Sequence, residues 1–311
     1  MSVHAEVTRS LADLPGRGVK RAVTIGKFDG VHLGHQGVIR SLSALAGGAE
    51  VTVVTFDRHP RALLDPASCP DDLLSVNQKI DALVDAGAHR VAVIPFTQEF
   101  ADLEPEEFSR QVLSDGLDAE VVLVGEDFRY GHEGRGTLET LREEGERSGF
   151  SVHTVADIVH TGGERISSTR IRSLLSEGEP AKAAELLGRH HRVRSQVVHG
   201  HQRGRLLGYP TANLQNPVEG FVPRDGVYAT WVQVAGEKFA AATSIGVNPT
   251  FGDVTQRMIE SHLFAFEGDL YDQVIEVSFV EYIRPMNQFA DADELATQMD
   301  RDAEQIKEIL S

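Results

Sequence analysis

Residues 24–35 read TIGKFDGVHLGH, and this stretch lies between a short apolar segment and a longer segment with helical spacing. An apolar run, then glycines, then a helical pattern is typical of the first strand, turn and helix of a parallel α/β sheet. Glycine lets the main chain approach a ligand closely, and the N–H groups at a helix start attract phosphate. The stretch therefore predicts an anion-binding turn at the carboxyl end of a strand.

The first 187 residues repeat this alternation of apolar runs and helical patterns. We expect parallel strands at Arg21–Ile25, Glu50–Phe56, Arg90–Pro95, Ala119–Val124 and Ser151–Val155. We expect helices between them at Gly34–Ala46, Asn77–Ala86, Pro105–Ser114 and Gly136–Ser148. Each helix can cross one face of the sheet, so residues 1–187 are predicted to form an α/β domain with a parallel sheet.

After Leu187 the pattern changes to short alternating stretches that indicate antiparallel strands. These stretches are Val193–His199, Val227–Val234, Phe239–Ile245, Ile259–Phe266 and Val274–Tyr282. Their close spacing, with Gly, Asn and Pro between them, favours a barrel or a sandwich. Asp291–Leu310 places apolar residues on one helical face and starts with acidic residues. Residues 188–311 are therefore predicted to form a separate β domain that a helix closes.

Length and composition limit the classes of protein to which the chain can belong. Its 311 residues exceed the size at which single hydrophobic cores stop growing, which predicts two domains. A net charge of −17 argues against nucleic acid as a partner, because phosphate-backbone binding needs clustered Lys and Arg. No window is apolar enough for a membrane helix, and the single cysteine, Cys69, excludes an intramolecular disulfide. We expect a cytoplasmic protein without a membrane partner, for which a homo-oligomer stays open.

His32 and His35 are the first candidate catalytic residues. They are three positions apart, so on a first helical turn both imidazoles can point the same way and donate hydrogen bonds to a triphosphate. An isolated pair of histidines is more often structural, but the glycine-bracketed position between strand and helix favours catalysis. A zinc site with His59 as third ligand is the weaker alternative, because no cysteine or HExxH pattern supports it.

The stretch resembles the HxGH signature of the nucleotidyltransferase superfamily, in the form carried by bacterial bifunctional riboflavin kinase/FAD synthetases. Two segments support this family, TFDRHP at residues 55–60 and VGEDFRYG at residues 124–131, and a third, RISSTRIR, follows at residues 165–172. The first two come at carboxyl ends of predicted strands, where ligands of parallel sheets bind. The resemblance implies that residues 1–187 are a Rossmann-like FMN adenylyltransferase, which joins ATP and FMN into FAD with loss of pyrophosphate.

By the same resemblance, the glycine-rich turn and the third segment hold ATP and its phosphates. The residues implied are Gly26, Phe28, Asp29, Gly30, Gly34, Arg165, Ser168, Thr169, Arg170 and Arg172. A Ser/Thr run before a helix is usually only an N-cap, but three arginines within eight residues of so acidic a chain favour anion binding. Asp127 is implied in flavin or nucleotide binding.

The β domain has a signature of its own, GRLLGYPTANL at residues 204–214, which resembles that of riboflavin kinases. The Thr211 hydroxyl and the Asn213 amide oxygen suit Mg²⁺ that is bound to nucleotide phosphates. Gly208 and Pro210 are implied in flavin or nucleotide binding. Without the rest of the motif, a proline turn with hydroxyl and amide caps would be the simpler interpretation.

Downstream, IESHLF at residues 259–264 alternates like a strand and resembles the family segment that supplies the catalytic glutamate. Glu260 is expected to accept the proton of the riboflavin 5′-hydroxyl as that oxygen attacks the γ-phosphorus of ATP. The resemblance thus implies an antiparallel-barrel riboflavin kinase in residues 188–311. Two alternatives remain open: a kinase whose adenylyltransferase half is inactive or takes another acceptor, and a flavin-binding regulator that does not catalyse.

Two other groups of residues are expected to be structural. His190 and His191, near the domain junction, are predicted to face solvent rather than to bind a metal. Trp231 and Phe239 are predicted to pack in the barrel core rather than to stack on flavin.

Overall fold

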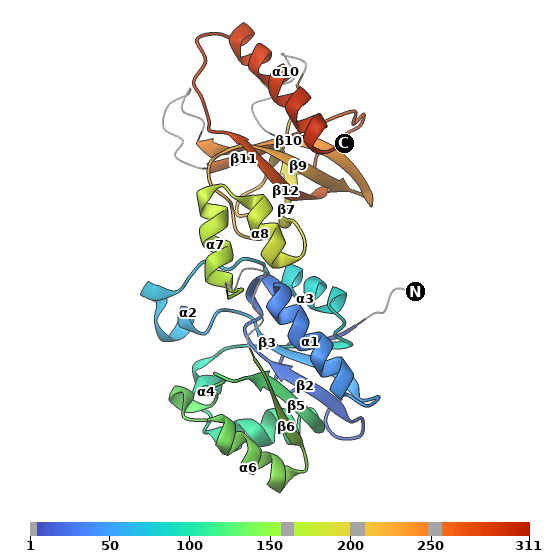
Figure 1. The fold of residues 1–311 in the computed structure, drawn as a ribbon, viewed down its shortest axis with the longest axis vertical. Coiled ribbons are helices and arrows are strands. Elements are labelled where there is room, and N and C mark those ends of the chain that lie inside the picture. The colour runs from blue at the N-terminus through green and yellow to red at the C-terminus, as the bar shows by residue number, and fades with distance from the viewer. Residues whose placement is uncertain (1–4, 157–164, 200–208, 248–256) are drawn as a thin grey trace. The chain divides into compact units, whose positions relative to one another are not determined.

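The computed structural model describes the chain except for residues 1–4, 157–164, 200–208 and 248–256 (Figure 1). Contacts within the chain divide it into two compact units, Met1–Ser167 and Ser168–Ser311. Each unit has a hydrophobic core of its own.

The first unit is built on a six-stranded parallel sheet in the order β1-β4-β3-β2-β5-β6. The strands are β1 (Glu6–Thr8), β2 (Arg21–Ile25), β3 (Glu50–Phe56), β4 (Arg90–Ile94), β5 (Ala119–Gly125) and β6 (Ser151–Val155). The predicted parallel sheet is confirmed, and β1 is an addition that is too short to show a pattern. The order reverses between β2 and β5, and open sheets of this kind bind ligands at the carboxyl ends of the strands beside such a reversal.

Helices cover both faces of this sheet (Figure 1). On one face α1 (Leu33–Leu45) and α3 (Val76–Asp85) bury apolar side chains against the strands. The other face is covered by α5 (Pro105–Phe108), a π-helical turn η3 (Ser109–Ser114) and α6 (Leu138–Ser148). The short elements are η1 (Asp29–Val31), α2 (Arg61–Leu64), η2 (Pro66–Ser68), α4 (Gln98–Ala101) and η4 (His132–Gly134). The predicted helix over 105–114 is thus one α-helical turn that continues as a π-helical turn.

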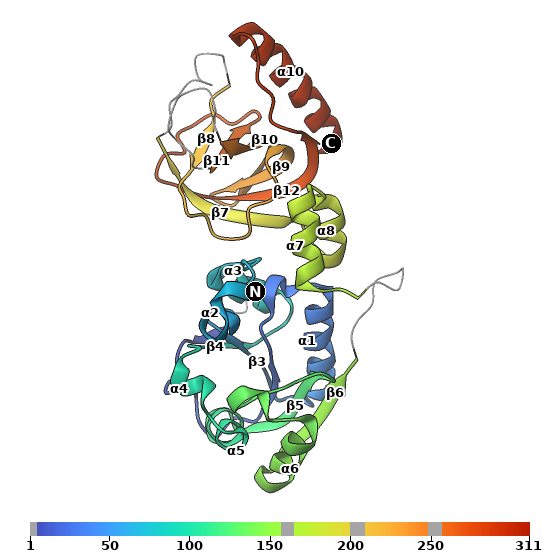
Figure 2. The same cartoon turned by 90° about the vertical axis from the view of Figure 1, so that its left-hand side faces the viewer.

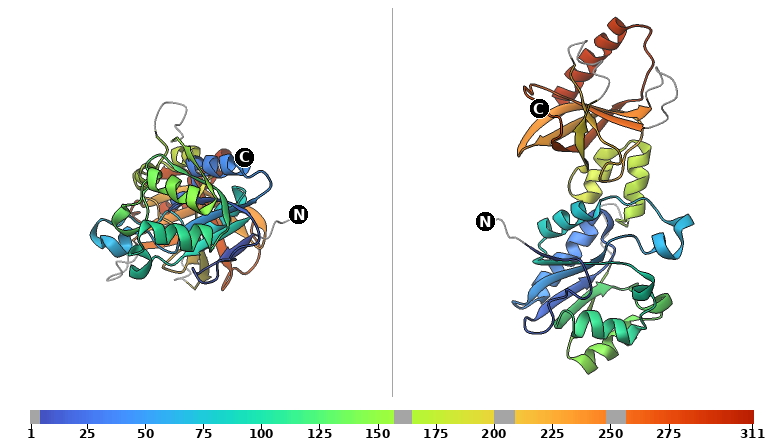
Figure 3. Two further views of the ribbon diagram at one scale, coloured as in Figure 1. Left: turned by 90° about the horizontal axis from the view of Figure 1, so that it is seen from below. Right: turned by 180° about the vertical axis from the view of Figure 1, so that it is seen from behind.

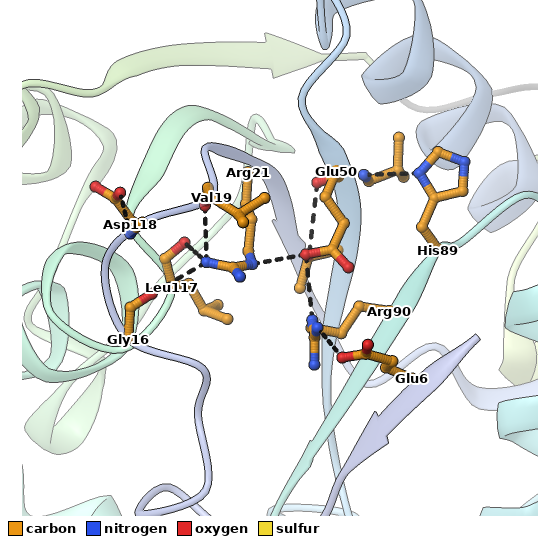
Figure 4. A network of polar contacts seen from close by, with 12 residues as sticks. Glu6, Gly16, Val19, Arg21, Glu50, His89, Arg90, Leu117 and Asp118 are labelled. Atoms are coloured by element: carbon orange, nitrogen blue, oxygen red, sulfur yellow. Dashed lines mark hydrogen bonds and ion pairs between the residues drawn. The ribbon is translucent and has the colours of Figure 1, made fainter. Parts of the chain in front are cut away.

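Four charged residues, each the first residue of its strand, form a network at the amino edge of the sheet (Figure 4). Glu50 Oε2 accepts from Arg21 Nε at 2.7 Å and from Arg90 Nε at 3.3 Å. Arg90 also pairs with Glu6. Arg21 Nη1 donates to the carbonyls of Gly16, Val19 and Leu117. The two guanidinium groups are almost completely buried, so this network satisfies charges that water cannot reach.

The second unit begins with a helical pair, α7 (Ser168–Glu177) and α8 (Pro180–Leu187), and continues as a closed antiparallel barrel in the order β10-β11-β8-β7-β12-β9 (Figure 2). The strands are β7 (His191–Val198), β8 (Ala212–Leu214), β9 (Gly226–Val234), β10 (Glu237–Val247), β11 (Arg257–Leu263) and β12 (Val274–Arg284). The barrel and its terminal helix α10 (Ala292–Ile309) confirm the predicted architecture.

Helix α10 lies along one side of the barrel (Figure 3, right). The side chain of Asp291 caps its start by accepting from the N–H of Glu294 at 2.9 Å. Farther along, Asp302 is buried and forms a forked ion pair with Arg284 of β12, with Nη2 to Oδ2 at 2.7 Å and Nε to Oδ1 at 3.0 Å. This pair fixes α10 to the end of the last strand.

Three buried hydroxyls lie next to one another inside the barrel. Thr243 Oγ1 lies 2.7 Å from Thr230 Oγ1 and 2.8 Å from Ser261 Oγ, so neighbouring strands β9, β10 and β11 are linked through their side chains. Because each hydroxyl has a hydrogen-bond partner, the polar group costs little to bury.

Two of the structural predictions are wrong. Trp231 is not in the core: it alternates with buried Val232, and the Lys238 ammonium lies 4.2 Å from its ring centroid. His191 does not face solvent but is buried, with Nε2 2.6 Å from the carbonyl oxygen of Phe221. Burial lowers the pKa of His191 to about 4, and that hydrogen bond opposes the shift only in part. Phe239 does pack against the core, as predicted.

Candidate functional site

The glycine-rich turn after β2 has a backbone that ordinary residues avoid. Phe28 and Gly30 have left-handed φ values of 48° and 78°. Phe28 is buried, and a Cβ at Gly26 would come within 3.2 Å of its ring. The ring therefore folds back over the turn because Gly26 has no side chain.

His32 ends this turn and caps α1. Its side-chain Nδ1 accepts from the N–H of His35 at 3.4 Å, which assigns the proton of neutral His32 to Nε2. The two imidazoles are stacked, with ring centroids 3.7 Å apart, and Phe28 contacts His35 edge-on. The structure thus brings the predicted pair together at the start of a helix.

Gly34 is required by this arrangement. A Cβ at position 34 would lie 3.0 Å from both Cε1 and Nδ1 of His32, tighter than nearly all real Cβ contacts. The glycine between the two histidines therefore leaves the space into which the His32 ring folds.

Neighbouring segments hold the turn in place. The hydroxyl of Thr55, on β3, donates to the carbonyl of Lys27 at 3.1 Å. Oδ1 of Asp29 accepts from the N–H of Leu73 at 2.8 Å, and Asp29 is buried. Since β2 and β3 pair in parallel, with Ile25 opposite Val54, their carboxyl ends meet at one edge of the sheet. Both hydrogen bonds therefore fix the turn at the edge where ligands of such sheets bind.

The other predicted nucleotide-binding residues of the first unit lie after β5 and β6. Asp127 follows β5 by two residues, and its exposed carboxylate lies 3.6 Å from Arg165 Nη2. β5 pairs directly with β2, so Asp127 follows a strand that neighbours the one before the histidine turn. Arg165 lies in the first unit, and one of its contacts is with the carboxylate of Asp127.

Four more predicted residues, Ser168, Thr169, Arg170 and Arg172, form the start of α7 in the second unit. Arg170 Nη1 lies 4.0 Å from Glu177 Oε2, near the end of the same helix. The helix before which the hydroxyl run was expected is therefore present, and it begins at Ser168.

The predicted kinase residues gather on two neighbouring strands of the barrel. Asn213 of β8 stands directly opposite Glu260 of β11 in the antiparallel register, so both side chains point to the same face of the sheet. Asn213 is buried, and its amide nitrogen donates to the carbonyl of Thr211 at 3.4 Å. Thr211 and Pro210 come just before β8, while Gly208 lies outside the described residues.

Two residues beside this pair were not expected from the sequence. His262 shares the face of Glu260, two positions along β11, and its Nδ1 lies 2.8 Å from the carbonyl oxygen of Pro210. Tyr209 packs edge-on against His262, and its hydroxyl donates to Asp300 of α10, which raises the pKa of Tyr209. The alternation Glu260, His262 was the available signal, because residues two apart on a strand share a face.

Among the residues that the structure describes, no group of three or more His, Cys, Asp or Glu side chains is arranged to hold a metal ion. His59, the third ligand of the zinc alternative, has its Nδ1 3.1 Å from the N–H of Arg61. In the same described part, no helix is both long and apolar enough to cross a membrane.

Comparison with known proteins assigns each half of the chain to a family. Residues 17–170 match the model of FAD synthetase, and residues 187–310 match that of riboflavin kinase. The bifunctional riboflavin kinase/FMN adenylyltransferase of Listeria monocytogenes is 34% identical, over 91% of this chain and 90% of the relative. Its counterpart in Escherichia coli K12 is 35% identical, over 94% and 93%.

A solved structure extends this agreement to the fold. A Streptococcus pneumoniae protein described as a macrolide-efflux protein is 30% identical and superposes with a TM-score of 0.87, over 97% of this chain and 98% of that one. Both halves and their order are thus shared with the relatives over almost the whole length. The chain belongs to the family of bifunctional riboflavin kinase/FMN adenylyltransferases.

Proposed function

We propose that this chain phosphorylates riboflavin to FMN on the barrel and adenylylates FMN to FAD at the carboxyl edge of the parallel sheet, with a separate ATP for each step. The observation that carries the proposal is that each half has its own polar constellation: stacked His32 and His35 in one, and the opposed Asn213 and Glu260 in the other. A flavin-binding regulator would not need either pair.

For adenylyl transfer, a phosphate oxygen of FMN attacks the α-phosphorus of ATP, and the bond to the β-phosphate oxygen breaks to release pyrophosphate. Negative charge then builds on the leaving group. His32 and His35 donate hydrogen bonds to it from the first turn of α1, where the helix dipole adds to the attraction. Gly26, Phe28, Asp29, Gly30 and Gly34 shape the turn, and Arg165, Ser168, Thr169, Arg170 and Arg172 assist with the phosphates, while Asp127 contacts flavin or nucleotide.

For the kinase step, the 5′-hydroxyl oxygen of riboflavin attacks the γ-phosphorus of ATP, and ADP leaves. Glu260 accepts the hydroxyl proton. Its position on a strand, opposite a buried asparagine, supports this role, because a rigid element holds the carboxylate in place. Gly208 and Pro210 line the flavin or nucleotide site by resemblance to the family.

The donor set of this half fits Mg²⁺ that is shared with nucleotide phosphates. Asn213 directs its amide nitrogen to the Thr211 carbonyl, and this orientation leaves the amide oxygen as the donor toward a cation. With the Thr211 hydroxyl it offers two hard oxygens that would hold Mg²⁺ together with the ATP phosphates. When bound, Mg²⁺ neutralises phosphate charge.

We place the functional boundary at residues 187 and 188, with adenylyltransferase before it and kinase after it. The matched family models leave residues 171–186 between them, which supports a boundary near this point. We further propose that the protein acts in the cytoplasm without nucleic-acid or membrane partners, and a homo-oligomer stays open.

The direct experiment supplies purified protein with riboflavin, ATP and Mg²⁺ and follows the flavins by chromatography. FMN and then FAD should accumulate, and recovery of riboflavin alone would falsify the proposal. FMN and ATP supplied without riboflavin should give FAD and pyrophosphate, and failure of that step alone would favour an inactive adenylyltransferase half. Chelation of Mg²⁺ should stop FMN formation.

Replacing Glu260 separates the two halves. Glu260→Ala should lower FMN formation by about 10²- to 10⁴-fold, because the attacking hydroxyl loses its proton acceptor. FAD formation from added FMN should stay unchanged. Glu237→Ala, at the exposed start of β10, is the matched control. Equal loss of both steps would point to one shared site or to unfolding.

The histidine pair gives the reciprocal test. His32→Ala with His35→Ala should lower FAD formation by about 10²-fold or more, since two donors to the leaving group are lost, and should spare FMN formation. His153→Ala, on an exposed position of β6, serves as control. Undiminished FAD synthesis by the double variant would remove both histidines from the mechanism.

A further inference from the structure

Lys79, in the middle of α3, is a buried cation that the mechanism above does not use. It is only 9% exposed, whereas lysine is almost never fully buried unless it is paired. Val76, Lys79, Ile80 and Leu83 follow the i, i+3, i+4, i+7 spacing of a core-facing stripe. Lys79 thus takes an apolar position of an amphipathic helix, and the cost of burying an ammonium there must be offset by specific contacts.

Those contacts reach the main chain near the carboxyl ends of two neighbouring strands. Lys79 Nζ donates to the carbonyl of Phe56 at 2.8 Å and to the carbonyl of Lys27 at 3.4 Å. Phe56 is the last residue of β3, and Lys27 lies in the histidine-bearing turn after β2. The Lys27 carbonyl also accepts from Thr55 Oγ1. One side chain therefore ties the start of the turn to the end of the adjacent strand.

Burial and nearby carboxylates act on the ammonium in opposite directions. Burial lowers the pKa of Lys79, and the carboxylates of Asp72, Asp29 and Asp57 oppose that shift. Asp29 lies in the same turn and accepts from the N–H of Leu73, just before α3. The start of α3 is itself fixed by a capping box between Ser75 and Gln78. The turn is thus attached to the α3 region at two points.

We propose that Lys79 is a positioning residue for adenylyl transfer: through the Lys27 carbonyl it fixes the turn from which His32 and His35 reach the nucleotide. This inference rests on the function proposed for that site and concerns how the imidazoles are placed. A displacement of about 1 Å can cost about 100-fold in rate, so a main-chain anchor just before the histidines has enough leverage.

A purely stabilising lysine would behave differently. Its loss would lower the fraction of folded protein but not the turnover of each folded molecule. A positioning lysine instead affects kcat for FAD formation in protein that is fully folded. The kinase step on the same polypeptide measures the amount of chain, and urea unfolding of the first unit measures its folded fraction.

The experiment compares Lys79→Met, which keeps length and loses the donor, with the unmodified protein in full-length form. Lys20→Met is the matched control, because Lys20 bonds Asp118 at 2.8 Å toward the opposite edge of the sheet. For Lys79→Met we expect kcat for FAD formation from FMN and ATP to fall about 10- to 100-fold. We expect KM for ATP to change less than about threefold, because misplaced imidazoles weaken contacts in the transition state more than ATP binding. FMN formation should stay constant.

Turnover per folded molecule equal to that of the unmodified protein would overturn the proposal, and so would a rise in KM at constant kcat. Lys79→Gln keeps a shorter donor, so its kcat for FAD formation should lie between that of Lys79→Met and that of the unmodified protein. If Lys79→Met does not fold, Lys79→Gln replaces it in the experiment. An unchanged kcat in Lys79→Gln would then overturn the proposed role of Lys79. Absence of FAD formation by the unmodified protein is a separate result, which contradicts the function of the site and removes the inference with it.

Discussion

The two edges of the parallel sheet hold buried cations in different ways. At the amino edge, Arg21 and Arg90 meet the carboxylate of Glu50, so opposite charges cancel in direct contact. At the carboxyl edge, Lys79 donates to the main-chain carbonyls of Lys27 and Phe56. The first arrangement joins the starts of strands and serves stability. The second fixes the path of a turn at the edge where we place the phosphates.

Among these variants, Glu50→Ala should lower the unfolding free energy most, because it disrupts the network at the amino edge. Removing the shared carboxylate leaves two buried guanidinium groups without it, which should cost about 3–5 kcal/mol of unfolding free energy. Urea unfolding of the variant measures this loss, with Glu120→Ala, exposed on β5, as control. FAD synthesis at low temperature should survive in the folded fraction. If Glu50→Ala lost FAD synthesis but kept its stability, the amino edge would not serve stability alone.

In the barrel, His191 is a buried polar group that contacts a main-chain carbonyl, and replacing it tests its contribution to stability. Its pKa is lowered from 6.5 to about 4, so the unfolded chain binds a proton that the folded chain refuses. Stability is therefore complete above pH 6.5 and declines as pH falls toward 4, by on the order of 3 kcal/mol in all. Between these pH values, the unfolding free energy of His191→Gln should depend less on pH than that of the unmodified protein. If the unfolding free energy of the variant falls equally steeply with pH, other groups cause the decline.

Glu6→Gln should have the smallest effect. Its side chain is 69% exposed although its partner Arg90 is buried, and such a rim contact contributes about 0–1 kcal/mol. The same urea measurement should thus barely separate this variant from the unmodified protein. A loss as large as that of Glu50→Ala would mean that the network acts as one unit rather than around Glu50.

The strands of both halves could be predicted because their apolar periods are plain in the sequence. β2, β3 and β6 have the expected bounds, and the histidine turn follows β2 as predicted. β1 and β8 were missed, since three residues are too few for a period to show. Contacts between segments far apart in the chain, such as His262 with Pro210, leave no trace in local spacing.

Buried charges were missed for a reason that can be corrected. Lys79 and Asp302 each interrupt the apolar stripe of an amphipathic helix, and apolar periodicity alone does not show whether such a charge is buried. Both turned out to be buried with specific partners. A charged residue at a core-facing helical position therefore indicates a polar contact across the fold. His191 gave no such signal, because its neighbour His190 made the pair look like exposed residues.

The hydroxyls of Thr230, Thr243 and Ser261 help to specify the register of the paired strands in the barrel. If one of these strands slipped by a single residue, its hydroxyl would turn outward and its former partner would be left facing hydrocarbon without a hydrogen bond. A slipped pairing would thus be less stable than the native one, and the buried hydroxyls favour the single register in which β11 presents Glu260.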